Sequence, residues 1–323
     1  MSSHVETKHY LPIRWVSGFD SSSLSLIIFT TEKCNFRCKY CYESFEHGKL
    51  TQSALTGINA LIEKRAPDLN HLSVSFFGGE PLLNQGAISD IASKAKALAK
   101  RHNFSFVGSV TSNGYLLSEK NFIEINELGI TNYQITLDGL EEEHNLLRPL
   151  SNGKGSFSQI MANIEQMAKS DKEFLLIVRM NYLPTNYTSL KLFLCRYKHI
   201  LADSRVKVHF HPVFSSDKFQ ALTIPEKKEY SIKLYEEARQ LGLAVVESSF
   251  NWTDEVCYAS KANHWIIRSD GRIQKCTVAV ENSINTVGKI TEDGSLNLNL
   301  NKLKKWIMSS NKKCPLSGFK ASD

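Results

Sequence analysis

Three of the seven cysteines stand close together near the front of the chain, at Cys34, Cys38 and Cys41. Three thiolates on one short loop can hold three irons of a cubane iron–sulfur cluster and leave the fourth iron open to a ligand. The alternative is a structural zinc site, which normally needs four nitrogen or sulfur ligands. His47 is the nearest candidate for the fourth ligand, so both interpretations stay open at this point.

A parallel α/β fold is predicted to position this loop. From residue 24 onward, strand-like apolar runs alternate with helical patterns, which is typical of repeated β-α units. The predicted strands are residues 24–30, 72–77, 104–110, 133–137, 174–180 and 206–211. Six such units make a partial (β/α)6 barrel of the TIM type, in which functional residues gather at the carboxyl ends of the strands.

Boundary residues agree with this order. Ser118 is expected to cap a helix that stops at Gly129, and Pro225 suits the first turn of another. From about residue 251, short strands replace the helical patterns. We therefore predict an N-terminal extension over 1–23, the partial barrel over 24–245 and a small C-terminal domain over 246–323.

Glycine-rich motifs follow the second and third predicted strands. Gly78 and Gly79 allow the backbone to approach a ligand closely, and Glu80 can bind an ammonium group. Asn113 comes before a glycine, which by itself predicts an ordinary tight turn. Because it also follows a strand, it is a candidate for a ribose or carboxylate contact.

The fourth and fifth strands carry polar residues at the same end. Thr136 and Asp138 close the fourth strand, and His144 and Arg148 follow. His144 suits a helix surface as well as a functional role. Arg179 lies on the fifth strand, where an inward-facing guanidinium is costly without an anion.

Two histidines alternate on the sixth strand, His209 and His211, so they face the same side. They can bind a metal, act as a base or pack at the mouth of the barrel. His211 and Asp138 are our candidates for catalysis. Cys195 falls in a helical pattern and is predicted to be a buried small hydrophobic residue.

The CxxxCxxC spacing, with Tyr40 before the last cysteine, resembles the signature loop of the radical S-adenosylmethionine (SAM) superfamily. The resemblance implies a four-iron four-sulfur (4Fe-4S) cluster on the three cysteines. It implies that SAM binds the open iron through its amino and carboxylate groups and is reductively cleaved to a 5′-deoxyadenosyl radical. It also implies roles in holding SAM: Tyr40 near the adenine, Gly78-Gly79-Glu80 at the amino group, Thr136 and Arg148 at the polar end, and the carboxylate as the anion for Arg179.

Three further cysteines lie in the C-terminal region. Cys257, Gly271 and Cys276 fit the CX9-15GX4C opening of SPASM and Twitch domains, and Cys314 can supply a third thiol. This resemblance implies one auxiliary iron–sulfur cluster; the alternative is three unpaired thiols. A full SPASM domain continues with more cysteines, whereas Ser317 stands where a further thiol is expected.

Composition indicates a globular protein of 323 residues with 42% hydrophobic residues. The formal charge of +6 is scattered in lysine pairs, which argues against nucleic-acid binding. The first 23 residues lack the features of a signal peptide, and the early apolar run is too short to span a bilayer. We therefore expect a cytoplasmic protein without membrane contact, in which cysteines bind metal.

The resemblance implies a peptide maturase that abstracts hydrogen from a ribosomally made peptide and so forms a crosslink, a thioether or an inverted stereocentre. Its expected partners are the precursor peptide and a low-potential electron donor such as a flavodoxin or ferredoxin. Because only 33 residues precede Cys34, a separate leader-binding protein is also expected.

Three alternatives remain. In a sulfatase-maturing radical enzyme, the resemblance implies an acidic residue directly after the second auxiliary cysteine, where this chain has Thr277. A nucleic-acid-modifying radical enzyme is disfavoured by the scattered charge. A non-catalytic iron–sulfur or zinc scaffold that binds a peptide has no need for a cofactor pocket at the strand ends.

Overall fold

A computed structural model describes residues 17–213, 222–246, 257–307 and 314 of the chain. Six parallel strands form its centre and follow one another in the order of the sequence. They are β1 (Ser23–Thr31), β2 (His71–Gly78), β3 (Ser105–Ser112), β4 (Ile130–Thr136), β5 (Leu175–Tyr182) and β6 (Val206–Pro212). Because the strands are parallel, their carboxyl ends all lie at one edge of the sheet.

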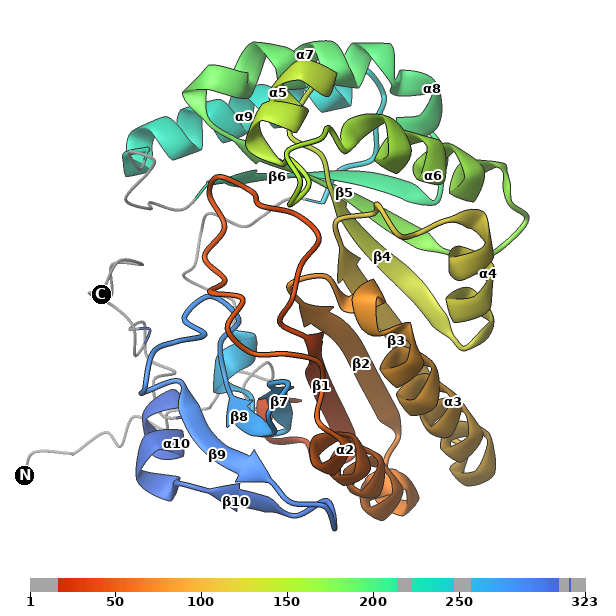
Figure 1. The fold of residues 1–323 in the computed structure, drawn as a ribbon, viewed down its shortest axis with the longest axis vertical. Helices are drawn as coiled ribbons and strands as arrows, with labels where there is room; N and C mark the ends of the chain where they lie inside the picture. Colours follow the sequence, from red (N-terminus) through yellow and green to blue (C-terminus); the bar gives the residue numbers. More distant parts are fainter. Residues whose placement is uncertain (1–16, 214–221, 247–256, 308–313, 315–323) are drawn as a thin grey trace, which may run out of the picture.

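Helices connect these strands and cover the outer side of the curved sheet, while the long loop after β1 extends across its open side (Figure 1). The helices are α2 (Gln52–Arg65), α3 (Gln85–His102), α4 (Glu119–Glu127), α5 (Glu141–Leu147), α6 (Phe157–Lys169), α7 (Tyr187–Arg196), α8 (Lys198–Leu201) and α9 (Ile224–Gln240). Their apolar stripes pack on the sheet, so that Ile58, Ile91 and Ile164 are fully buried with Leu26 and Val74.

The C-terminal region continues the same sheet on the other side of β1. Strand β7 (His264–Ile267) pairs with β1 in parallel, and β8 (Arg272–Gln274), β9 (Thr286–Ile290) and β10 (Leu296–Leu298) follow as antiparallel neighbours. Helix α10 (Leu300–Ile307) packs beside β9. The strand before the cysteine loop is therefore held between β2 and β7.

The predicted partial barrel is confirmed, with each of the six strands found within a few residues of its expected range. The boundary signals are also confirmed. The Ser118 hydroxyl accepts a hydrogen bond from the Asn121 amide at 3.4 Å at the start of α4. Pro225 lies in the first turn of α9, behind a capping box formed by Thr223 and Glu226.

One expectation for a single residue is wrong, and one alternative that the sequence left open is decided. Cys195 is exposed on α7 rather than buried, because it lies on the solvent side of that helix. His144 is fully buried rather than on a helix surface. Its Nδ1 accepts from the Asp138 amide at 3.3 Å, and its Nε2 lies 3.1 Å from the Ser156 hydroxyl. Among the described helices, none has the length and apolar character needed to cross a bilayer.

Candidate functional site

A cavity of about 660 Å³ opens at the carboxyl ends of the six parallel strands. Most of the residues predicted for the site line it, namely Cys34, Cys38, Tyr40, Cys41, Gly78, Gly79, Asn113, Thr136, Arg148, Arg179 and His211. The structure thus brings together motifs that lie up to 177 residues apart, from 34 to 211. Glu80 and Asp138 are fully buried beside the cavity.

The three thiols of the loop share one electrostatic environment. Burial is the main reason that the pKa of Cys34 is raised to about 12, and the nearby Glu80, Cys38 and Cys41 contribute to the same rise. Burial likewise raises the pKa of Cys41 to about 11. The Cys34 sulfur accepts a hydrogen bond from the Phe36 amide at 3.3 Å. Such amide donors stabilise thiolates that bind a cluster and tune its potential.

The geometry argues against a single zinc ion at this loop. One zinc needs its ligands close together around a single ion, and within the described residues no group of three or more His, Cys, Asp or Glu side chains is arranged to hold one metal ion. A cubane instead places each thiolate on a separate iron. His47, the candidate fourth zinc ligand, has its Nε2 only 2.9 Å from an Arg272 nitrogen.

The Tyr40 hydroxyl is the centre of a buried hydrogen-bond network. It donates to the Asp138 carboxylate and accepts from Arg148 at 2.9 Å and from the Asn181 side chain at 3.0 Å. The other Asp138 oxygen accepts from the Asn181 amide at 3.1 Å. Burial raises the pKa of Asp138, while the Arg148 charge opposes that rise. Asp138 therefore lies behind Tyr40 and fixes its orientation.

Arg148 has an unsatisfied donor beside the cavity. Its Nε atom is buried and has no hydrogen-bond partner among the described residues. Burial disfavours its charge, but the nearby Cys38, Tyr40 and Asp138 outweigh this and raise the pKa of Arg148. A buried donor without a partner is costly, so this position suits a ligand with an acceptor group.

Glu80 is satisfied by the protein itself. Its carboxylate accepts from the Asn113 amide at 2.7 Å, the Ser112 hydroxyl at 2.9 Å and the Leu82 amide at 3.1 Å. Burial raises the pKa of Glu80 to about 6 in spite of these bonds. The Asn113 side chain in turn donates to Asn35 at 2.8 Å, beside Cys34. Glu80 thus ties the ends of β2 and β3 to the cysteine loop.

The two glycines after β2 are needed by the protein backbone. A Cβ atom on Gly78, which has φ +122°, would lie 2.1 Å from the Thr31 carbonyl oxygen, and one on Gly79 would lie 2.5 Å from that of Lys33. Both carbonyls belong to the start of the cysteine loop. From the sequence, we predicted that these glycines let a ligand approach the backbone. In the structure, the absence of their side chains allows the end of β2 to pack closely against the backbone that follows β1.

We expect Gly79→Ala to destabilise the protein by about 1–3 kcal/mol, because the loop must move to relieve the overlap. Urea unfolding followed by circular dichroism measures this change. Gly86→Ala on α3 is the matched control, since nothing lies within 4 Å of the added atom and alanine favours helix. Equal unfolding midpoints for the two variants would contradict the steric argument.

The three C-terminal cysteines also come together. Burial raises the pKa of Cys257, and Cys276 and Cys314 raise it further. The Cys276 sulfur accepts from the Val278 amide at 3.5 Å. Next to it, Thr277 lines the cavity and lies 2.9 Å from the Tyr258 hydroxyl. The residues that follow Cys257 and Cys276 in the sequence therefore line the same cavity as the cysteine loop.

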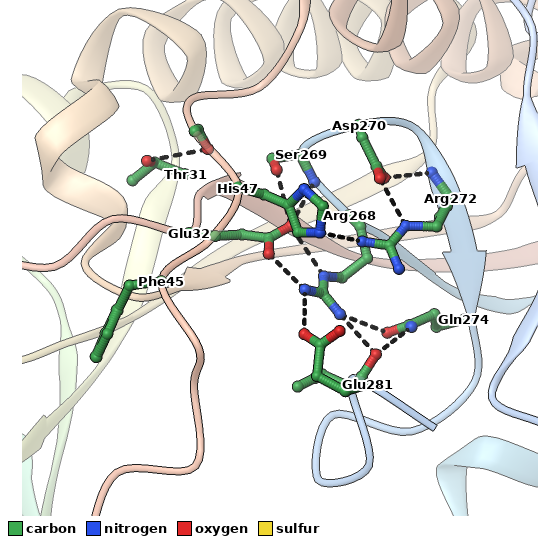
Figure 2. A network of polar contacts seen from close by, with 12 residues as sticks. Thr31, Glu32, Phe45, His47, Arg268, Ser269, Asp270, Arg272, Gln274 and Glu281 are labelled. Atoms are coloured by element: carbon green, nitrogen blue, oxygen red, sulfur yellow. Dashed lines mark hydrogen bonds and ion pairs between the residues drawn. The ribbon is translucent and has the colours of Figure 1, made fainter. Parts of the chain in front are cut away.

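A buried arginine joins the two cysteine loops (Figure 2). Arg268 is fully buried, and it donates to both oxygens of Glu32, which precedes Cys34 by two residues. It also donates to the Val280 carbonyl at 2.7 Å and to the Glu281 carboxylate at 3.0 Å, beyond Cys276. Burial alone disfavours the Glu32 charge, but hydrogen bonds from Arg268 and Ser269 lower the pKa of Glu32.

Several of these residues were missed in the sequence. Asn181 follows Arg179 by two positions on β5, so the alternation of a strand places both on one face. Glu43 also lines the cavity, and its buried Oε1 has no hydrogen-bond partner among the described residues. Burial raises the pKa of Glu43 to about 7. Nothing in the sequence indicated a role for Glu43, Arg268 or Glu32, because the residues that they interact with are far away in the sequence.

Comparison with known proteins decides the family. The sequence model of the radical SAM superfamily matches residues 28–188, which include the cysteine loop and strands β2 to β5. The chain belongs to the radical SAM superfamily. The non-catalytic scaffold alternative loses support, since the chain is a radical SAM enzyme.

Two curated radical SAM relatives and one solved structure resemble the chain. The cysteine-type anaerobic sulfatase-maturating enzyme of Clostridium novyi is 31% identical over 49% of this chain and 44% of its own. The sporulation killing factor maturation protein SkfB of Bacillus subtilis is 25% identical over 81% of this chain and 62% of its own. The structure of anSMEcpe with bound AdoMet and Cp18Cys peptide has a TM-score of 0.67 at 18% identity and covers 92% of this chain and 82% of that one. That likeness shows the fold.

Radical SAM membership implies a 4Fe-4S cluster and SAM, and the residues present fit both. All seven cysteines lie in the described part of the chain and none forms a disulfide. The three loop thiols line the cavity, and the unsatisfied Arg148 Nε lies at its wall. The cavity lies within the 300–1,000 Å³ range that small-molecule sites occupy.

Proposed function

We propose that this radical SAM enzyme modifies a ribosomally made peptide, by abstracting hydrogen and so forming a crosslink, a thioether or an inverted stereocentre. The observation that carries the proposal is one cavity lined both by the cluster loop and by the C-terminal residues Tyr258, Thr277 and Val278. The maturation relatives support it. A cytoplasmic location, a flavodoxin- or ferredoxin-type electron donor and a separate leader-binding protein belong to the same proposal.

The chain's own residues hold and orient the reactants. Cys34, Cys38 and Cys41 hold the cluster, which when bound supplies the electron that cleaves SAM to a 5′-deoxyadenosyl radical. Arg148 and Thr136 bind the polar end of SAM. Tyr40, fixed by Asp138, orients the adenine. We therefore assign Asp138 a positioning role.

His211 lines the cavity as a neutral ring. Burial lowers the pKa of His211 to about 3, and the nearby Arg179 charge adds to this effect. Its Nδ1 lies 2.7 Å from the Pro212 carbonyl oxygen and donates to it. A neutral imidazole held in this way orients a substrate group by hydrogen bonding, and it is a weak proton acceptor.

A peptide encoded beside the gene tests the proposal. The anaerobically reconstituted enzyme, with reductant and SAM, is expected to remove two hydrogens from the peptide, or to exchange one for deuterium from heavy water if a stereocentre is inverted. Mass spectrometry measures both outcomes. Release of 5′-deoxyadenosine without any change in candidate peptides would contradict the peptide substrate and leave the radical chemistry intact.

We further propose an auxiliary iron–sulfur cluster on Cys257, Cys276 and Cys314. Its support is a shared local geometry. At Cys257 and at Cys276, the sulfur accepts a hydrogen bond from the backbone amide of the residue two positions later in the sequence. The same bond is found at Cys34 and at Cys41. The same hydrogen-bond pattern therefore recurs at both groups of thiols. Such bonds are a feature of cluster ligands.

Iron analysis of a variant with Cys34, Cys38 and Cys41 all replaced by alanine tests this site alone. We expect about three to four irons and as many sulfides per chain after reconstitution. Adding Cys257→Ala and Cys276→Ala is expected to remove them. Iron near zero in the first variant would eliminate the auxiliary cluster from the proposal.

A sulfatase-maturing activity is the second candidate, favoured by the Clostridium novyi relative. The chain has Thr277 where that branch is expected to carry an acid, and the Thr277 hydroxyl is engaged by Tyr258. Glu43 offers a carboxyl group in the same cavity. Oxidation of a sulfatase-derived peptide by the reconstituted enzyme would favour this candidate over a crosslinking maturase.

A further inference from the structure

We infer that Arg179 binds a carboxylate of the peptide substrate, either an acidic side chain or the end of the peptide chain. The inference rests on the proposed function and names a chemical feature of its substrate. It revises the expectation from the sequence, in which the SAM carboxylate was the partner of Arg179.

Arg179 lines the cavity without a carboxylate partner. Its Nε donates to the Asn181 side chain at 2.9 Å, and among the described residues no Asp or Glu forms an ion pair with it. A buried guanidinium is costly unless an anion accompanies it. The contrast with Arg148 is direct, since burial lowers the pKa of Arg179 overall while the partners of Arg148 raise its pKa.

The two arginines lie at different distances from the cysteine loop. Arg148 donates directly to the hydroxyl of Tyr40, which stands between Cys38 and Cys41, so a SAM carboxylate at the open iron would lie near Arg148. Arg179 reaches the same hydroxyl only through the Asn181 side chain, and it pairs in register with His209 on β6. Its guanidinium is therefore one side chain further from the loop than that of Arg148.

The charges of the site leave room for a second anion. SAM carries a sulfonium, an ammonium and a carboxylate, so it would add about one net positive charge, which the roughly single net negative charge of a cubane on three thiolates would offset. Within the protein, Asp138 acts on both Arg148 and Arg179. One carboxylate does not compensate two guanidinium groups.

The other charged wall of the cavity does not serve Arg179. Burial is the main influence on the pKa of Glu43, and the charges that act on it are those of Arg268, Glu32 and Glu281, which places it toward the C-terminal strands. The charged groups that act on Arg179 are Asp138 and Arg148, and the two tyrosines Tyr40 and Tyr42 lie near it. His211, Pro212 and Val213 line the same cavity. An arginine fork that lines a cavity is suited to bidentate binding of a carboxylate.

Binding of small carboxylates to the reconstituted enzyme with SAM tests the inference by isothermal titration calorimetry. The probes are N-acetylglutamate α-amide for an acidic side chain, N-acetylglycylglycine for a chain end, and N-acetylglutamine α-amide as the neutral control. We expect one carboxylate probe to bind more tightly than the neutral one, and Arg179→Gln to weaken it at least about tenfold. Arg179→Lys should lie between, because lysine lacks the fork. The probe that binds identifies the source of the carboxylate.

The comparison variant is Arg148→Gln, which is expected to weaken the binding of SAM. The binding of SAM is measured by the change that it causes in the electron paramagnetic resonance spectrum of the reduced cluster. The inference is overturned if Arg179→Gln weakens SAM binding as much as Arg148→Gln does. It is also overturned if neither carboxylate binds the wild-type enzyme more tightly than the neutral probe. Failure of the wild-type enzyme to release 5′-deoxyadenosine would instead refute the proposed function, since probe binding needs no turnover.

Discussion

Cys38→Ala reduces the release of 5′-deoxyadenosine to the background of the reductant alone. Cys38 is the middle thiol of the loop, and it interacts with Cys34, Cys41 and the Arg148 charge. Two remaining thiolates cannot hold a cubane with a single open iron. Anaerobic reconstitution followed by chromatography of the nucleoside measures the loss.

Cys195→Ala is the matched control for this experiment. Cys195 is exposed on α7 and does not line the cavity, so the same substitution there should leave nucleoside release at the wild-type rate. If Cys38→Ala kept a substantial part of that rate, the loop thiols would not carry the cluster.

Arg268→Met has the largest expected effect on stability, about 3–5 kcal/mol. It leaves the Glu32 carboxylate buried without its partner, and an uncompensated buried charge is costly. Urea unfolding of the anaerobic protein measures the change in free energy. Both cysteine loops should also lose iron, because the guanidinium holds the residues before Cys34 and after Cys276.

Two further variants separate the contributions around Arg268. Glu281→Gln removes a half-exposed partner of the same guanidinium and should cost at most about 1 kcal/mol. Combining Arg268→Met with Glu32→Gln should recover part of the loss, since no charge then remains buried. If Glu281→Gln were as harmful as Arg268→Met, the buried pair would not be the source of the stability.

The sequence predicted the convergence of the site because parallel strands end at a common edge. The residues at or just after the strand ends, from Gly79 to His211, could be placed there without knowing any side-chain direction. The direction itself could not be predicted. Glu80 turns inward to the Asn113 amide, and Asp138 lies behind Tyr40, because loops after strands have no fixed alternation.

Contacts between segments that are far apart in the chain could also not be predicted from the sequence. Glu32 and Arg268 are separated by 236 positions, and neither stands in a motif. Their pairing follows from the register of β1 with β7, which periodicity cannot supply. That Cys257, Cys276 and Cys314 lie near one another could be predicted only from the spacing of the cysteines in the sequence.

The placement of β1 between β2 and β7 has a consequence for biogenesis. A ribosome must deliver residues up to 267 before the strand that precedes the cysteine loop gains its second neighbour. Pairing between such distant segments forms slowly, because a long chain must first close on itself. Iron and sulfide are therefore expected to be inserted after synthesis, into a nearly complete protein rather than a growing chain.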